Sequence, residues 1–181
     1  MADPAGPGDP QRHAAGLVQP ERDQRKVRLI TTESRITIDS SVGEVWAYVC
    51  DVERWPEWAP TVLECWIRGG APLQPGSRID QRAKDLWWTH RRSQEVTAVE
   101  APRCVAFAGP MGTSVARWGM ELKAMADTQT DATMWIGVEL AGIMRAVPGR
   151  ILRGRIQRVS NLEMALIKAA VEATTPNASA S

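Results

Sequence analysis

Hydrophobic and polar residues alternate along most of the chain between about residues 61 and 142. Residues 113–125, for example, place Trp118, Met120 and Leu122 on one face of a strand and mostly polar or small residues on the other. A period of two is typical of a strand with one face in a core and the other in water. The pattern therefore predicts an antiparallel sheet with one wet side.

Turn residues divide this region into separate strands. Glycine, proline and aspartate stand at most of the breaks, where they favour tight turns. Together with an earlier alternating segment, SRITI, the predicted strands are 34–38, 61–68, 77–84, 87–99, 104–109, 113–125 and 132–140. Short connections of this kind again indicate antiparallel neighbours.

Two short helices are predicted between the first two of these strands. Ser41 and Glu44 have the spacing of a capping box, in which the serine hydroxyl accepts a backbone N–H and the glutamate reaches back to the cap. The helix that begins there runs through Val49. Pro56 and Pro60 then leave room only for a second short helix or a turn.

A long helix is predicted from about Pro148 to about Ala173. Its apolar residues recur at helical spacing, which predicts a buried stripe. The stripe consists of Leu152, Ile156, Val159, Leu162 and Leu166. The order of elements is that of an α+β fold in which a curved antiparallel sheet wraps around one C-terminal helix. Because such a sheet cannot close fully on a single helix, we expect a cavity in the gap.

Composition separates this domain from its flanks. Residues 1–27 are rich in proline, glycine, alanine and charge, and 174–181 are similar, so both are predicted to be disordered tails of a single domain at 28–173. The formal net charge of +1 gives no overall attraction to nucleic acid or to an anionic membrane. The sequence has no apolar run of signal-peptide or membrane-spanning length, so we expect a cytoplasmic protein.

Cysteine and histidine are too few and too scattered for a metal site or a disulfide framework. The chain has Cys50, Cys65 and Cys104, no CxxC pair, and only His13 and His90 as other soft ligands. Cys65 and Cys104 are predicted to fill the core rather than to act as nucleophiles, because neither has an evident histidine partner. Phosphate-loop, dinucleotide, GxSxG and HExxH motifs are missing from the sequence, and we expect neither a metal nor a cofactor.

Aromatic residues are almost all tryptophan: eight Trp against one Tyr and one Phe. Indole rings suit the walls of a cavity for a flat or bulky guest, although core packing is the alternative for any one of them. The predicted apolar lining consists of Trp88, Trp118, Met120, Val159 and Leu166.

The fourth strand of the predicted sheet is the richest in candidate chemistry. Trp88, His90, Arg92 and Gln94 share a face with Val96, which predicts that this face points inward. His90 could exchange protons near neutral pH, and Arg92 could hold an enolate or a carboxylate through its planar guanidinium. Gln94 would add a neutral amide to the ligand-binding wall. The alternative is that this end of the strand leaves the core and is solvated.

Glu163 lies near the centre of the apolar stripe of the long helix. A carboxylate there must be paired, protonated or close to an opening, because burying a lone charge costs several kcal/mol. A raised pKa would suit a general acid or base. A salt bridge to a strand arginine, or a slight rotation of the helix, would explain the position equally well.

Basic residues gather around the start of the long helix, where positive charge opposes the helix dipole. The cluster consists of Arg145, Arg150, Arg153, Arg155 and Arg158. One interpretation is docking of an acidic acyl carrier protein, or of its phosphopantetheine arm, at the mouth of the cavity. The other is an ordinary solvated face.

The sequence resembles the polyketide cyclase/dehydrase and lipid-transport superfamily, which is related to START proteins. The resemblance rests on SSVGEVWAYVCDVERWPEWAP, the turn PGSR and VEAPRCVAF, and it extends from about Arg35 to Ala173. Its most specific part is DVERWPEW, which is also close to the coenzyme-Q-binding branch. The resemblance implies a helix-grip fold with a deep apolar cavity between the sheet and the long helix.

The resemblance also implies candidate chemistry. Arg82 falls where members that cyclise aromatic polyketides carry an arginine that orients the chain, whereas Val62 stands where some of them use a tyrosine. We therefore expect a cofactor-free cyclase or dehydratase of a polyketide-like intermediate, with His90, Arg92, Glu163 and Arg82 as catalytic candidates. The alternative is a non-catalytic carrier of a lipid, quinone or pigment. The expected partners are a hydrophobic small molecule and an acyl carrier protein, and the protein is expected to be a monomer or homodimer.

Overall fold

The computed structural model describes residues 28–85 and 88–174. Within them the chain forms seven strands, which are β1 (Arg28–Ile38), β2 (Val62–Ile67), β3 (Arg78–Asp85), β4 (Trp88–Glu100), β5 (Cys104–Met111), β6 (Ser114–Ala126) and β7 (Gln129–Leu140). The helices are α1 (Val42–Cys50), α2 (Trp55–Trp58) and α3 (Gly149–Thr174), with short 3-10 turns η2 (Val52–Arg54), η3 (Arg68–Gly70) and η4 (Gly142–Ala146). The predicted tail at 1–27 and residues 175–181 lie outside the described residues.

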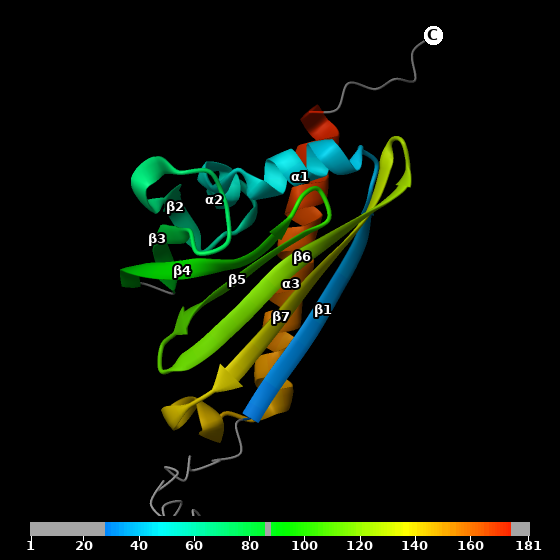
Figure 1. The fold of residues 1–181 in the computed structure, drawn as a ribbon. Coiled ribbons are helices and arrows are strands. Elements are labelled where there is room, and N and C mark those ends of the chain that lie inside the picture. Colours follow the sequence, from blue (N-terminus) through cyan, green and yellow to red (C-terminus); the bar gives the residue numbers. More distant parts are fainter. Residues whose placement is uncertain (1–27, 86–87, 175–181) are drawn as a thin grey trace, which may run out of the picture.

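The seven strands form one antiparallel sheet in the order β1-β7-β6-β5-β4-β3-β2 (Figure 1). Each strand from β2 to β6 pairs with the next along the chain, as expected for short connections. The first strand instead pairs with the last, so β1 and β2 are the two edges of the sheet. The predicted α+β fold, with a curved sheet and a long C-terminal helix, is confirmed.

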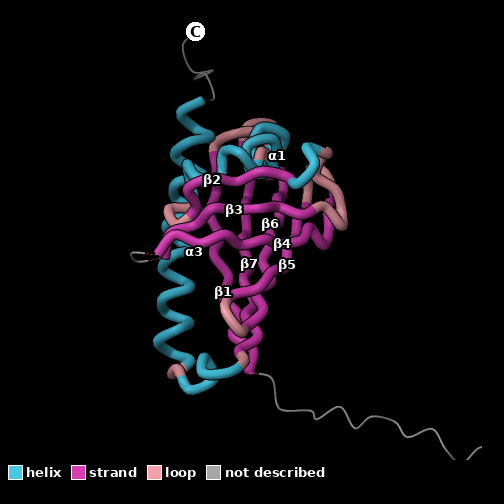
Figure 2. Tube along the Cα trace, turned by 90° about the vertical axis from the view of Figure 1, so that its left-hand side faces the viewer, coloured by secondary structure: helices cyan, strands magenta, loops and turns pink. Residues whose placement is uncertain are grey.

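Helix α3 lies along one face of the sheet and follows the direction of β1 (Figures 1 and 2). Helices α1 and α2 lie between the sheet and the C-terminal end of α3, where their buried side chains join the main core (Figure 1). The predicted capping box at the start of α1 is present: the Ser41 hydroxyl accepts the Glu44 N–H at 3.4 Å, and the Ser41 N–H donates to the Glu44 carboxylate at 3.0 Å. These two bonds satisfy N–H groups that the first turn of a helix leaves unpaired.

The buried side of α3 differs from the predicted stripe. Its buried residues are Ser160, Met164, Ile167 and Val171, whereas Leu162 is 51% exposed and Val159 is 45% exposed. The predicted stripe is therefore wrong for these two residues. The helix is rotated so that its second half packs against the core, and the small Ser160 can be buried because its hydroxyl donates to the Ile156 carbonyl at 3.1 Å.

Candidate functional site

A cavity of about 440 Å³ lies between α3 and the inner face of the sheet. Helix α2 borders it with Trp55 and Trp58, and strands β3 to β7 contribute the side that faces the helix. Helix α3 supplies Arg155, Ile156, Val159 and Glu163. Of these helix residues, Arg155 and Val159 are exposed to solvent as well, so this part of α3 marks the mouth of the cavity.

Tryptophan side chains form one wall. Trp118 stacks on Phe107 with ring centroids 4.3 Å apart and meets Trp55 edge-on at 5.2 Å. Trp58 lies 6.4 Å from Trp118. Such offset and edge contacts stabilise aromatic clusters beyond the burial of their area. Both interpretations of the tryptophans therefore hold here, because these rings pack in the core and also border the cavity.

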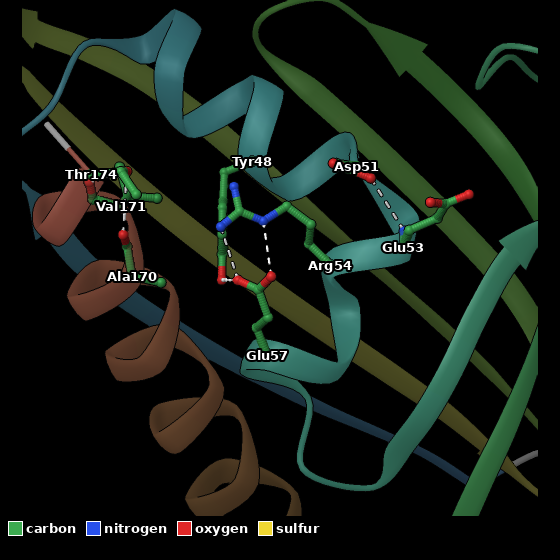
Figure 3. Close-up of polar contacts among 8 residues, drawn as sticks. All are labelled: Tyr48, Asp51, Glu53, Arg54, Glu57, Ala170, Val171 and Thr174. Atoms are coloured by element: carbon green, nitrogen blue, oxygen red, sulfur yellow. Dashed lines mark hydrogen bonds and ion pairs between the residues drawn. The ribbon is translucent and has the colours of Figure 1, made fainter.

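A polar network next to the indoles holds the short helix in place. Arg54 donates two hydrogen bonds of 3.0 Å to the Glu57 carboxylate, and the Tyr48 hydroxyl donates to it at 3.1 Å (Figure 3). The guanidinium carbon of Arg54 lies 4.4 Å from the centre of the Tyr48 ring. Because Arg54 and Glu57 flank Trp55 in the sequence, this network fixes the turn that directs Trp55 and Trp58 inward.

Polar side chains of β3 and β4 form a second wall. The Arg92 Nε donates to Gln81 Oε1 at 2.6 Å, and the Trp118 Nε1 donates to Gln94 Oε1 at 2.8 Å. Arg92 lies opposite Gln81 in the strand register, and Gln81 is only 2% exposed. Each glutamine oxygen is therefore occupied by a donor from the protein, which fixes the orientation of Arg92 and of the Gln94 amide.

Gly109 makes room for Gln94. A β-carbon at position 109 would lie 2.8 Å from the Gln94 Cβ, closer than two such carbons approach, and a tight 3.2 Å from the Ser93 carbonyl oxygen. Both Gly109 and Gln94 line the cavity. The glycine thus lets β5 pass close to β4 at the polar wall.

Glu163 faces these polar residues from the helix. Burial raises the pKa of its carboxyl group to about 7, and the positive charge of Arg92 partly opposes that rise. No hydrogen bond or salt bridge to this carboxyl group is formed by the residues that the structure describes. Near neutral pH, Glu163 can therefore accept or release a proton without first breaking an ion pair.

Some predicted site residues lie elsewhere on the inner face. Trp88 is 72% exposed at the first position of β4, so the prediction that it lines the cavity is wrong. His90 is half-buried on the same strand but is not part of the lining. The inward face predicted for β4 reaches the cavity only at Arg92 and Gln94, because the first residues of the strand lie beyond the cavity.

Three further predicted residues are not in the lining. Arg82 lies on the outer face of β3, on the side opposite Gln81, where it forms an ion pair with Glu64 on β2. Met120 is fully buried in the core, and Leu166 is partly buried against it. The structure thus brings together Arg92, Gln94, Trp118, Val159 and Glu163 from the predicted set.

Gln81 and Trp58 are among the cavity residues that the sequence analysis missed. Gln81 precedes Arg82, and only the strand parity decides which of the two points inward. Trp58 belongs to the segment on which the family resemblance rested, but nothing in its pattern marked it as part of the cavity lining. Its side chain is 2% exposed, and its indole N–H has no hydrogen-bond partner in the structure.

Cysteines and metal ligands add no further chemistry to this site. Burial raises the pKa of the Cys50 and Cys65 thiols to about 12, which keeps both protonated and poorly nucleophilic. No group of three or more His, Cys, Asp or Glu side chains in residues 28–85 and 88–174 could hold a metal ion. In the same residues, no helix is both long and apolar enough to cross a membrane.

The fold and the cavity define a helix-grip protein with an internal site for a hydrophobic guest. The sequence matches the family described as polyketide cyclase/dehydrase and lipid transport over residues 30–172. The chain therefore belongs to that family. A search of curated proteins finds no significant match.

Solved structures with the same fold are only distantly related in sequence. A START superfamily protein from Mycobacterium smegmatis has a TM-score of 0.67 and 16% identity, with 80% of this chain and 99% of that chain covered. The Zhui aromatase/cyclase from Streptomyces sp. R1128 has a TM-score of 0.67 and 11% identity, with 85% and 100% covered. The di-domain ARO/CYC BexL has a TM-score of 0.65 and 18% identity, with 79% and 46% covered. At these identities the similarity shows the fold alone.

Proposed function

We propose that the protein is a cofactor-free cyclase or dehydratase that acts on a polyketide-like intermediate of natural-product biosynthesis, such as an antibiotic pathway, in the cytoplasm. The observation that carries this proposal is the presence of Arg92 and Glu163 together in the lining of one largely apolar cavity. Two of the structural neighbours, Zhui and BexL, are titled aromatase/cyclase and ARO/CYC, which is consistent with this chemistry.

The chemistry requires one group that moves a proton and one that stabilises negative oxygen. The Glu163 carboxylate takes a proton from a carbon between two carbonyl groups, and the enolate attacks another carbonyl carbon of the same chain. The new alkoxide recovers a proton from the carboxylic acid, and a later elimination releases one water. A pKa of about 7 suits both directions of transfer at neutral pH.

Arg92 would stabilise the enolate and alkoxide oxygens. Its guanidinium is fixed by Gln81, so no reorientation is needed when negative charge develops. The tryptophan wall would hold the guest in a folded conformation and exclude water, which is itself worth several kcal/mol of barrier.

A non-catalytic carrier of a lipid, quinone or other hydrophobic molecule is the alternative. The observation that favours it is the Trp55, Trp58 and Trp118 wall, which suffices to bind such a guest without any proton transfer. The enzyme would need the polar wall for proton transfer and for stabilising negative oxygen, whereas the carrier would need neither.

Single-turnover rates with a linear poly-β-ketone thioester would separate them. For the enzyme, Glu163→Gln should lower the rate by about 10²–10⁴, the range for losing a positioned acid or base. Arg92→Lys should also lower the rate, because lysine keeps the charge but loses the planar fork. His90→Gln, on β4 but outside the lining, is the matched control and should leave the rate near wild type. If both variants keep the wild-type rate, Glu163 and Arg92 are not catalytic, and the carrier function is favoured.

An acyl carrier protein is the partner we propose for delivering the substrate. Arg150, Arg153, Arg155 and Arg158 are exposed on the first half of α3, and Arg155 also lines the cavity. A basic surface at the mouth would attract an acidic carrier. Replacing Arg153 and Arg158 by glutamine should weaken capture of the carrier-bound substrate and flatten its salt dependence, while turnover of a free thioester stays unchanged.

A further inference from the structure

The cavity contains positive charge that the protein itself does not neutralise. Arg92 and Arg155 both line it, and neither forms a salt bridge within the described part of the chain. The one acidic residue in the lining, Glu163, is the group whose burial disfavours its charge. A cationic side chain beside apolar walls is costly without an anionic partner. Arg155 is solvated at the mouth, so Arg92 is the cation for which a guest could supply the partner.

The unused hydrogen-bonding groups of the cavity are mostly donors. Gln81 Oε1 and Gln94 Oε1 already accept from Arg92 and Trp118. The terminal guanidinium nitrogens of Arg92 remain as donors. A protonated Glu163 adds an O–H. A guest that satisfies these groups must present acceptor oxygens rather than donors.

We propose that the guest carries an ionised carboxylate-type group, which binds to Arg92 beside the protonated carboxyl group of Glu163, so that affinity falls as Glu163 loses its proton. This inference rests on the cavity used for the proposed function and concerns a guest other than the thioester substrate. It commits to a free hydrophobic acid, in contrast to a neutral lipid, a quinone or a thioester.

The direction of the pH effect follows from the charges that face Glu163. Helix α3 adds Arg155, β4 adds Arg92, and the other lining side chains, from α2, β2, β3, β5, β6 and β7, are uncharged. With Glu163 protonated, the lining has two positive charges and no negative one. Above a pH of about 7 the Glu163 carboxylate repels the anionic guest and competes for Arg92. Binding of an anion should in turn raise the pKa of Glu163 further.

The test compares two probes of the same shape, 2-naphthoate and its neutral amide, 2-naphthamide. Binding to the full-length protein is measured by tryptophan fluorescence and calorimetry at about pH 6 and about pH 9, where the naphthoate is ionised throughout. The wild type should bind naphthoate about tenfold tighter than naphthamide at the lower pH, and this preference should shrink at least about threefold at the higher pH.

Variants assign the effect to residues. Glu163→Gln should retain the preference for naphthoate at both pH values, and Arg92→Gln should abolish it. Arg92→Lys keeps the charge and should retain part of the preference, which provides a second readout if Arg92→Gln fails to fold. Arg91→Gln removes an exposed arginine from the opposite face of the same strand, outside the lining, and is the matched control.

The outcomes separate this inference from the proposed function. Equal binding of both probes by the wild type at about pH 6 overturns the acidic-guest inference and leaves the hydrophobic cavity intact. A naphthoate preference that is unchanged in Arg92→Gln and Arg92→Lys overturns the assignment to Arg92. Failure of the wild type to bind either probe, together with an absence of turnover, overturns the proposed function itself.

Discussion

The two halves of helix α3 meet different surroundings although they belong to one continuous helix. In the second half, Met164, Ile167 and Val171 are almost completely buried against the main core. In the first half, the residues that turn toward the sheet face the cavity, and Val159 is both exposed and part of its lining. One half anchors the helix, and the other half forms a wall of the site.

This difference explains how the fold can keep a gap next to its core. Helices α1 and α2 contact the second half of α3 and fill the space under it. The first half has no such helix beneath it, so the walls of the cavity are left unfilled. The tightly packed half supplies stability that the half facing the cavity does not.

The largest effect on folding is expected in the anchoring half. Ile167→Ala removes a fully buried side chain and should lower the free energy of unfolding by about 2–5 kcal/mol. Urea denaturation followed by circular dichroism would measure it. A loss below about 1 kcal/mol would contradict the contrast between the two halves.

Glu163→Gln should raise the free energy of unfolding, by less than Ile167→Ala lowers it, and only at higher pH. Burial raises the pKa of Glu163 from 4.5 to about 7 in the folded protein, so the wild type loses stability as the pH rises from 4.5 to about 7. Glutamine cannot ionise, and the variant should be about 2–3 kcal/mol more stable than wild type at about pH 8. At about pH 4 the two proteins should be nearly equal. Equal stability at both pH values, in matched urea titrations, would show that Glu163 is solvated or paired.

The smallest effect is expected at the mouth. Val159→Ala should change the free energy of unfolding by no more than about 0.5 kcal/mol, because the side chain is already exposed. Its affinity for a hydrophobic dye should fall slightly, whereas Ile167→Ala should leave that affinity unchanged once the protein is folded. Dye titration of both variants under strongly native conditions makes this comparison. A mouth substitution as destabilising as Ile167→Ala would mean that the cavity closes in solution.

Periodicity was sufficient for the elements and for the fold. The strands and the long helix follow from alternation, turn residues and helical spacing, and these signals survive in one sequence because each is local. The capping box at Ser41 also lies in a local pattern. A cavity was expected because the sheet cannot close on one helix, and the family resemblance, with which the family match agrees, implied the same.

The orientation of side chains was less accessible to sequence reasoning. Leu162 is apolar but exposed and Ser160 is polar but buried, because the rotation of α3 is decided by contacts with distant elements. Arg82 and Gln81 differ by one position, and one position reverses the face of a strand. Trp88 fits the alternation of β4 and still lies outside the cavity. Alternation predicts which face of a strand a residue lies on, but not which part of that face other elements cover.

The pairing of β1 with β7 also has a mechanical consequence. The two strands are paired without interruption from Arg28 opposite Leu140 to Ile38 opposite Thr130. Arg28 and Thr174 lie at opposite ends of the domain, and β1 runs alongside α3 (Figure 1). A force that separates these two residues would pull β1 along its own axis and load its inter-strand hydrogen bonds together in shear. We expect this domain to resist extension more strongly than a domain whose terminal strands unzip one bond at a time, and single-molecule pulling from these two positions would measure the difference.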